Sequence, residues 1–162
     1  MIIVSDSGPL IALSKIKHLD ILEKFFGEII IPEAVWIEVV EKGEGRPGAQ
    51  DVKESPWIKV NKVKNKIGIE ALKHEIGIGE SEAIILAMEL NANIVLMDDK
   101  IARGIAGSMG LKVAGTLSII YEAINNKLIN EKFNEMIKIM RKNNIWISDE
   151  IIDIIEKDGL QM

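Results

Sequence analysis

Residues 77–103 read GIGESEAIILAMELNANIVLMDDKIAR, and this stretch decides the fold. Its first half predicts a buried helix over residues 80–91, opened by glycines and carrying acids in its first turn. Its second half predicts a buried strand over 94–97 that ends in two adjacent aspartates. The N-terminus repeats the second pattern, because an apolar strand at residues 2–4 is followed by Asp6.

Short apolar runs alternate with helical patterns along the rest of the chain. Further strands are expected at 29–31, 57–60 and 111–114. A first helix is expected to start at Ser7 or Gly8, with Pro9 in its first turn. Further helices are expected over 18–26, 32–41, 69–75 and 100–109, from Gly115–Thr116 onward, and over 131–142 and 149–157, with one helical turn at 51–54 inside a loop over 42–56. This alternation predicts a mostly parallel sheet covered on both faces. Ligands of such sheets bind at the carboxyl ends of the strands, so the acids that follow the strands are expected to meet at one edge.

The composition limits the classes of protein and of site. A chain of 162 residues with 48% hydrophobic content predicts one domain with a full core. No apolar run approaches the roughly 20 residues that cross a bilayer, and the apolar N-terminus predicts no signal peptide. The absence of cysteine excludes disulfides, zinc–thiolate sites and cysteine catalysis, and favours a cytoplasmic protein.

Only two histidines are present, His18 and His74, so oxygen ligands and therefore Mg²⁺ or Mn²⁺ are favoured for any metal. The formal net charge of −5 argues against a general nucleic-acid coat. It does not exclude an enzyme that cuts nucleic acid, since clustered carboxylates carry negative charge until metals fill them.

Each acid that follows a strand can be interpreted either as a structural residue or as part of a metal site. Asp6 is either a helix cap or a metal ligand, and Ser7 beside it either caps the helix or bonds a metal-bound water. Asp98 and Asp99 are like charges at neighbouring positions, which is costly unless they are solvated or bridged by a cation. One of the pair is expected to cap the next helix and the other to face the site, and the sequence does not say which.

Glu80 and Glu82 lie in the first helical turn, where either carboxylate also suits the helix dipole. The helical wheel places Glu80 on the more apolar face and Glu82 about 200° away, so Glu80 is preferred as ligand and Glu82 is the second choice. Glu38 reads, unaided, as an ordinary exposed glutamate. Lys100 and Arg103 lie one turn apart and either hold a phosphate or pair with acids, and the basic run over 59–66 reads as a solvated edge.

Taken in order, these motifs resemble the PIN-domain family, and within it a prokaryotic branch related to VapC-type toxins. The resemblance rests on DSGPLIAL at residues 6–13, Glu38, GIGESEAI at 77–84 and LMDDKIAR at 96–103, and it runs from Met1 to about Leu128. It implies a three-layer α/β/α fold with a central parallel sheet. The chain is then a single PIN-like domain over 1–162, with 129–162 as a C-terminal helical extension.

The resemblance also implies a nuclease that depends on Mg²⁺ or Mn²⁺, usually acts on RNA, and leaves 5′-phosphate and 3′-hydroxyl ends. The acids it assigns are Asp6, Glu38, Glu80 (or Glu82) and Asp98 or Asp99; metal is expected on Asp6, Glu80, Asp98 and Asp99, the substrate phosphate on Lys100 and Arg103, and support from Ser7. A small antitoxin partner and a homodimer are further expectations. The third acid is commonly an aspartate in the toxins, and a glutamate here shifts the metal by about 1.5 Å.

Two rival functions follow from the same residues. A catalytically silent PIN-like binding or regulatory module would explain the acidic net charge and the unusual third acid. A phosphatase with Asp6 as nucleophile, as in the haloacid-dehalogenase enzymes, needs a second aspartate two residues on to act as general acid, and Gly8 occupies that place.

Overall fold

The fold is built on a parallel sheet, as the alternation of strands and helices predicts. The computed structural model describes residues 1–158, and within these the sheet has five strands in the order β3-β2-β1-β4-β5. Every adjacent pair is parallel. The strands are β1 (Ile3–Ser5), β2 (Ile29–Pro32), β3 (Ile58–Asn61), β4 (Ile94–Leu96) and β5 (Val113–Ala114).

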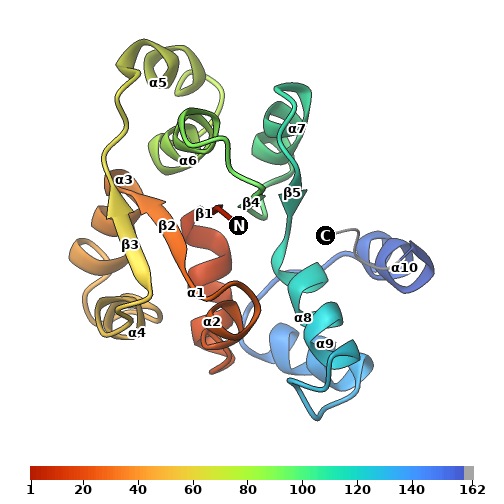
Figure 1. Ribbon diagram of the computed structural model, residues 1–162. Coiled ribbons are helices and arrows are strands. Elements are labelled where there is room, and N and C mark those ends of the chain that lie inside the picture. Colours follow the sequence, from red (N-terminus) through yellow and green to blue (C-terminus); the bar gives the residue numbers. More distant parts are fainter. Residues whose placement is uncertain (159–162) are drawn as a thin grey trace.

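Helices cover both faces of the sheet, which gives the expected three layers (Figure 1). On one side lie α5 (Lys66–Leu72), α6 (Ile78–Glu89) and α7 (Lys100–Ser108). On the other lie α1 (Ser7–Lys15), α2 (Ile21–Phe26), α8 (Thr116–Asn125) and α9 (Phe133–Lys142). The remaining helical segments are α3 (Glu33–Trp36), the π-helical turn η1 (Ile37–Glu41), α4 (Ala49–Lys53) and α10 (Asp149–Asp158).

The central strands β1 and β4 are buried on both faces because each face carries its own core. In β1, Ile3 packs with the layer that contains α1 and α8, whereas Val4 packs with the layer that contains α6 and α7. β4 repeats this alternation with Ile94 and Val95. A strand buried on both sides reads as a continuous hydrophobic run, which is why the runs in the sequence predict parallel strands.

The helices after residue 128 share the core of the α1 and α8 layer. Met136 and Met140 of α9 and Ile155 of α10 are buried in it. Ser148 accepts a hydrogen bond from the backbone N–H of Ile151 at 3.2 Å and so caps α10. No helix among the residues described is long and apolar enough to cross a membrane.

One expected helix begins elsewhere. The sequence predicts a short helix over 69–75, but α5 spans Lys66–Leu72. Its start is set by Asn65, whose side chain accepts the backbone N–H of Gly68 at 3.0 Å. Asparagine is among the preferred N-cap residues, and here it lies inside a run of lysines that hides the signal.

Candidate functional site

Acids from separate parts of the chain meet at the carboxyl edge of the sheet. β1 and β4 are neighbours in register, and they end at Ser5 and Leu96. Asp6 follows β1 directly, and Asp98 comes two residues after β4. From β1 the chain adds β2 and β3 on one side, and it then adds β4 and β5 on the other side of β1. A parallel sheet opens a crevice where the order of its strands reverses in this way.

Asp6 is the most buried of these acids. Its side chain is 5% exposed, and its Oδ1 has no hydrogen-bond partner within residues 1–158. Burial, as the largest cause, and the charges of Glu80, Glu38 and Asp98 together raise the pKa of Asp6 from 3.8 to about 7, whereas the backbone N–H of Ser7 acts in the opposite direction. A buried carboxyl among like charges is unfavourable as an anion unless a positive charge joins it.

Glu80 lies in the first turn of α6 and is half-buried. Burial raises its pKa, and the charges of Asp99 and Glu38 add to the effect, while the backbone N–H of Gly77 opposes it. Glu80 Oε2 is buried and, like Asp6 Oδ1, has no partner among the residues described. The first-turn position suits the helix dipole, yet it leaves one oxygen of this carboxylate without a structural role.

The two adjacent aspartates each engage a different helix. Asp99 caps α7, because its Oδ2 accepts the N–H of Ala102 at 2.9 Å. Asp98 binds the start of α8, where Thr116 donates its backbone N–H to Oδ1 at 2.7 Å and its hydroxyl to Oδ2 at 2.6 Å. Both also belong to the acidic group, since Asp98 contributes to the raised pKa of Asp6 and Asp99 to that of Glu80.

Glu38 reaches the same acids from η1, the π-helical turn after α3. Gly79 of α6 lies between Asp6 and Glu38. A Cβ at this position would lie 3.5 Å from Asp6 Oδ1 and 3.9 Å from Glu38 Oε2. Both oxygens therefore lie within 4 Å of one point that glycine leaves free. Glu38 is exposed, as its sequence context alone predicts, but its charge acts on the buried Asp6.

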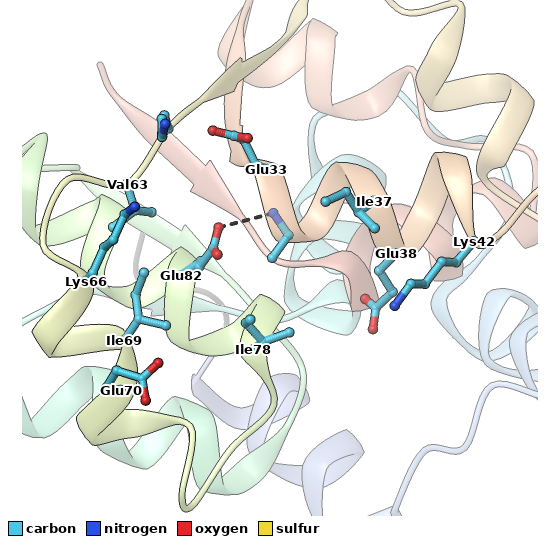
Figure 2. Close-up of a pocket in the computed structure, with 12 residues that line it drawn as sticks. Glu33, Ile37, Glu38, Lys42, Val63, Lys66, Ile69, Glu70, Ile78 and Glu82 are labelled. Carbon is cyan, nitrogen blue, oxygen red and sulfur yellow. Dashed lines mark hydrogen bonds between the residues drawn. The ribbon is translucent and has the colours of Figure 1, made fainter.

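Glu82 is directed away from this point. Its Oε1 accepts the backbone N–H of Ala34 at 3.1 Å, at the N-terminus of α3 (Figure 2). A carboxylate at that position satisfies a free N–H group and suits the helix dipole. Glu80, in the first turn of α6, and Glu82, one position beyond that turn, therefore have different neighbours, Asp99 and Ala34 respectively.

A groove of about 520 Å³ is lined by Glu38 but by none of the other four acids of the group. Figure 2 shows Ile37, Glu38 and Lys42 on one wall, Ile69 and Glu70 on the other, and Ile78 and Glu82 between them. Lys62 and Lys66 also line it. These two lysines belong to the basic run that the sequence assigns to a solvated edge, so part of that run borders a groove next to Glu38.

The remaining candidate residues differ in their distance from the acids. Arg103 is half-buried, and its Nη1 packs against Gly115, next to Asp98 Oδ1. Lys100 is exposed in the first turn of α7. Ser7 is the first residue of α1, and its backbone N–H favours the charged form of Asp6.

The acids share one edge without forming a finished coordination sphere. Across residues 1–158, no three His, Cys, Asp or Glu side chains are gathered closely enough to hold a metal ion. The backbone brings Asp6, Glu38, Glu80, Asp98 and Asp99 into one neighbourhood, and rotation of side chains is needed to turn their oxygens toward a common centre.

Sequence reasoning missed three residues that shape this edge. Thr116 holds Asp98, Gly79 lies between Glu38 and Asp6, and Gly8 lies against Asp98, since a Cβ on Gly8 would lie 3.4 Å from Asp98 Oδ2. A signal existed for the first: Gly115–Thr116 follows β5, a strand beside β4, and glycine offers no side chain to cap the helix that starts there.

Comparison with known proteins assigns the chain to a family. A family profile described as a PIN domain matches residues 2–158, which includes α9 and α10 beyond the expected limit near Leu128. A search of curated proteins finds no match. The profile covers nearly the whole chain, and the parallel sheet with helices on both faces agrees with it. The chain belongs to the PIN-domain family.

Proposed function

We propose that this protein is a metal-dependent endoribonuclease that hydrolyses phosphodiester bonds. One observation carries the proposal: Asp6 Oδ1 and Glu80 Oε2 are buried, lack hydrogen-bond partners within residues 1–158, and lie among three further carboxylates. A buried polar atom without a partner is costly and needs an explanation, for which a cation is the simplest. PIN-domain proteins are generally nucleases, and the chain belongs to this family.

The residues fit Mg²⁺ or Mn²⁺. The donors are all carboxylate oxygens, which these ions prefer, and Gly79 leaves space between Asp6 and Glu38. Asp6, Glu38, Glu80, Asp98 and Asp99 are the ligands that we propose, with Glu82 kept as the second choice for the place of Glu80. A bound cation supplies a water of lowered pKa and offsets negative charge on the phosphate.

The chain's own residues hold and orient the substrate. For the scissile phosphate we propose Arg103, whose Nη1 lies with Asp98 Oδ1 near Gly115, and as a second, more exposed candidate Lys100 at the start of the same helix. Lys42, Lys62 and Lys66 line the groove together with four glutamates, so a single strand lying there would have its phosphates placed along the three lysines. The apolar floor of the groove suits the bases.

A matched pair of variants tests the ligand assignment. We expect Glu80→Gln to lower Mn²⁺-dependent RNA cleavage by more than the roughly 10–100-fold that loss of an outer partner of a metal typically costs. Glu82→Gln keeps an oxygen for Ala34 and loses only its charge at the helix start, so it should retain cleavage and lose at most about 1 kcal/mol of stability. Cleavage rates of a labelled RNA at fixed Mn²⁺ and urea unfolding separate the two effects. The reverse order of activities would transfer the third acid to Glu82.

A second candidate is a catalytically silent module. It is favoured by the lack, among the residues described, of three acids gathered for a metal, and by the glutamate at the third acidic position. Calorimetric titration with Mn²⁺ separates the candidates: saturable binding supports the nuclease, and its absence at millimolar Mn²⁺ supports the silent module.

The biological setting remains an expectation from the resemblance. We propose a cytoplasmic toxin of the VapC-related branch, paired with a small antitoxin and forming a homodimer. The absence of cysteine supports the location. Light scattering gives the number of protomers, and expression alone and together with the product of the neighbouring gene tests toxicity and its relief.

A further inference from the structure

Thr116 holds both oxygens of Asp98. Its backbone N–H donates to Oδ1 at 2.7 Å and its hydroxyl donates to Oδ2 at 2.6 Å. Thr116 is 3% exposed and is the first residue of α8. A carboxylate has about four positions that accept hydrogen bonds or metals, so two such bonds fix its plane and leave acceptor positions on each oxygen.

The start of α8 is built to receive this carboxylate. Its N-cap residue is Gly115, which has no side chain to accept the free N–H groups of the first turn. Asp98 takes that place from the end of β4. A Cβ on Gly115 would lie 3.1 Å from Asp98 Oδ1 and would collide with Arg103 Nη1, so glycine at this position lets both side chains approach α8.

The carboxylate is confined from a second side by α1. A Cβ on Gly8 would lie 3.4 Å from Asp98 Oδ2, the oxygen that accepts the Thr116 hydroxyl. Asp98 is thus fixed between two helix starts, at the edge where it also raises the pKa of Asp6. Glu38 differs, because it lies on the π-helical turn η1 and not between two helix starts.

We infer that Thr116 is a positioning residue, which sets the orientation of the Asp98 carboxylate toward a divalent cation shared with Asp6. The inference rests on the proposed metal site and adds a residue to it. The hydroxyl is the essential part, since it holds Oδ2, the oxygen nearer to α1. Valine has the shape of threonine without the hydroxyl, whereas serine keeps the hydroxyl.

The first test compares variants by Mn²⁺ calorimetry. Thr116→Val should weaken Mn²⁺ binding by roughly 10–100-fold, the usual effect of removing a residue that orients a metal ligand. Thr116→Ser should retain most of the parent affinity. Ser118→Ala, two positions on in α8 and also buried, is the matched control and should bind as the parent does. Circular dichroism and thermal unfolding in EDTA show that each variant is folded.

The second test uses the parent protein and needs no variant. Thr116 is the only threonine in the sequence, so a protein labelled with ¹³C at threonine methyl groups gives a single methyl signal. Mg²⁺ should shift this signal with the dissociation constant that calorimetry gives, and Mn²⁺ should broaden it beyond detection. A signal that stays sharp when the calorimetric site is full of Mn²⁺ overturns the inference.

The outcomes separate this inference from the proposed function. If the parent binds Mn²⁺ and Thr116→Val binds it equally well, the role of Thr116 is wrong and the nuclease proposal stands. If the serine variant is as weak as the valine variant, the hydroxyl is not the group that acts, and the inference is also overturned. If the parent binds no Mn²⁺ at all, both proposals fail together.

Discussion

We expect Asp6→Asn to abolish Mn²⁺-dependent RNA cleavage and, without metal at pH 7, to unfold at a higher temperature than the parent. Asp6 is 5% exposed, and its Oδ1 has no partner within residues 1–158. An uncompensated buried carboxylate destabilises the folded state, whereas an asparagine amide of the same shape is neutral. Its NH₂ group would also donate toward the carboxylates that surround it. Loss of the charge removes a proposed ligand, so activity and stability should change in opposite directions.

The pH dependence follows from the sign of the pKa shift. Burial raises the pKa of Asp6 in the folded protein to about 7, against 3.8 as its ordinary value. The folded state then binds the proton more tightly than the unfolded state does, so this contribution to stability is present below pH 3.8 and is lost as the pH rises toward 7. A shift of about 3 pH units at about 1.4 kcal/mol each gives at most about 4 kcal/mol.

Urea unfolding in EDTA from pH 4 to pH 8 measures this effect. The stability of Asp6→Asn relative to the parent should be smallest near pH 4 and should increase up to pH 7. Asp153→Asn, at an exposed position on α10, is the control and should follow the parent at every pH. Parallel curves for Asp6→Asn and the parent would mean that Asp6 does not hold its proton in the folded state.

Added Mn²⁺ should reverse the order of stabilities. A cation that binds the folded parent stabilises it by mass action, whereas the Asp6→Asn site binds the cation weakly. The parent is therefore expected to gain stability with Mn²⁺ concentration and to overtake the variant at pH 7. A parent whose unfolding is insensitive to Mn²⁺ would contradict the reading of Asp6 as a ligand.

Hydrophobic patterning was sufficient to predict the sheet. β1 and β4 are buried on both faces, and a strand buried on both faces needs apolar residues at successive positions, which the sequence shows as continuous apolar runs. It also predicts that Asp6 and Asp98 meet, because parallel strands end at the same edge. The separation of Glu80 from Glu82 followed from the helical wheel, since it depends only on the period of the helix.

Contacts between elements could not be predicted in the same way. Glu38 is carried by a π-helical turn, and nothing in the residues 37–41 distinguishes this turn from an α-helix. The hydroxyl of Thr116 meets Asp98 across 18 residues of chain. Gly79 reads as a hinge in the sequence, but its role depends on the positions of Asp6 and Glu38, which belong to other elements. Patterns within one segment of the sequence do not predict these contacts between residues on different elements.

Gly79→Ala is expected to stabilise the metal-free protein while it abolishes metal binding. Gly79 lies in the first turn of α6, where alanine is favoured over glycine by up to about 1 kcal/mol. The new methyl would lie 3.5 Å from Asp6 Oδ1, 3.6 Å from Val35 Cγ2 and 3.9 Å from Glu38 Oε2, which are ordinary contacts. The helix therefore accepts the methyl without strain.

On the proposed assignment, the methyl would fill space beside Asp6 and Glu38 that a cation held by both residues would need. Mg²⁺ binds oxygen at about 2.0–2.1 Å, so an ion shared by Asp6 and Glu38 must lie between their oxygens. A methyl group there excludes the ion and its waters, and it buries Asp6 further. Because displacement of reacting groups by about 1 Å is enough to cost about 100-fold, we expect Mn²⁺-dependent cleavage to decrease at least that much.

Gly104→Ala provides the matched control for this substitution. Gly104 is exposed in α7, and a Cβ there meets no described atom within 4 Å, so alanine should give the same gain in helix stability and leave the acids untouched. Thermal unfolding in EDTA should show both variants at or above the parent. Calorimetry with Mn²⁺ should then separate them, with binding kept in Gly104→Ala and lost in Gly79→Ala. Equal affinity in the two variants would show that Asp6 and Glu38 do not share a cation, and the metal would have to be placed nearer to Glu80 and Asp99.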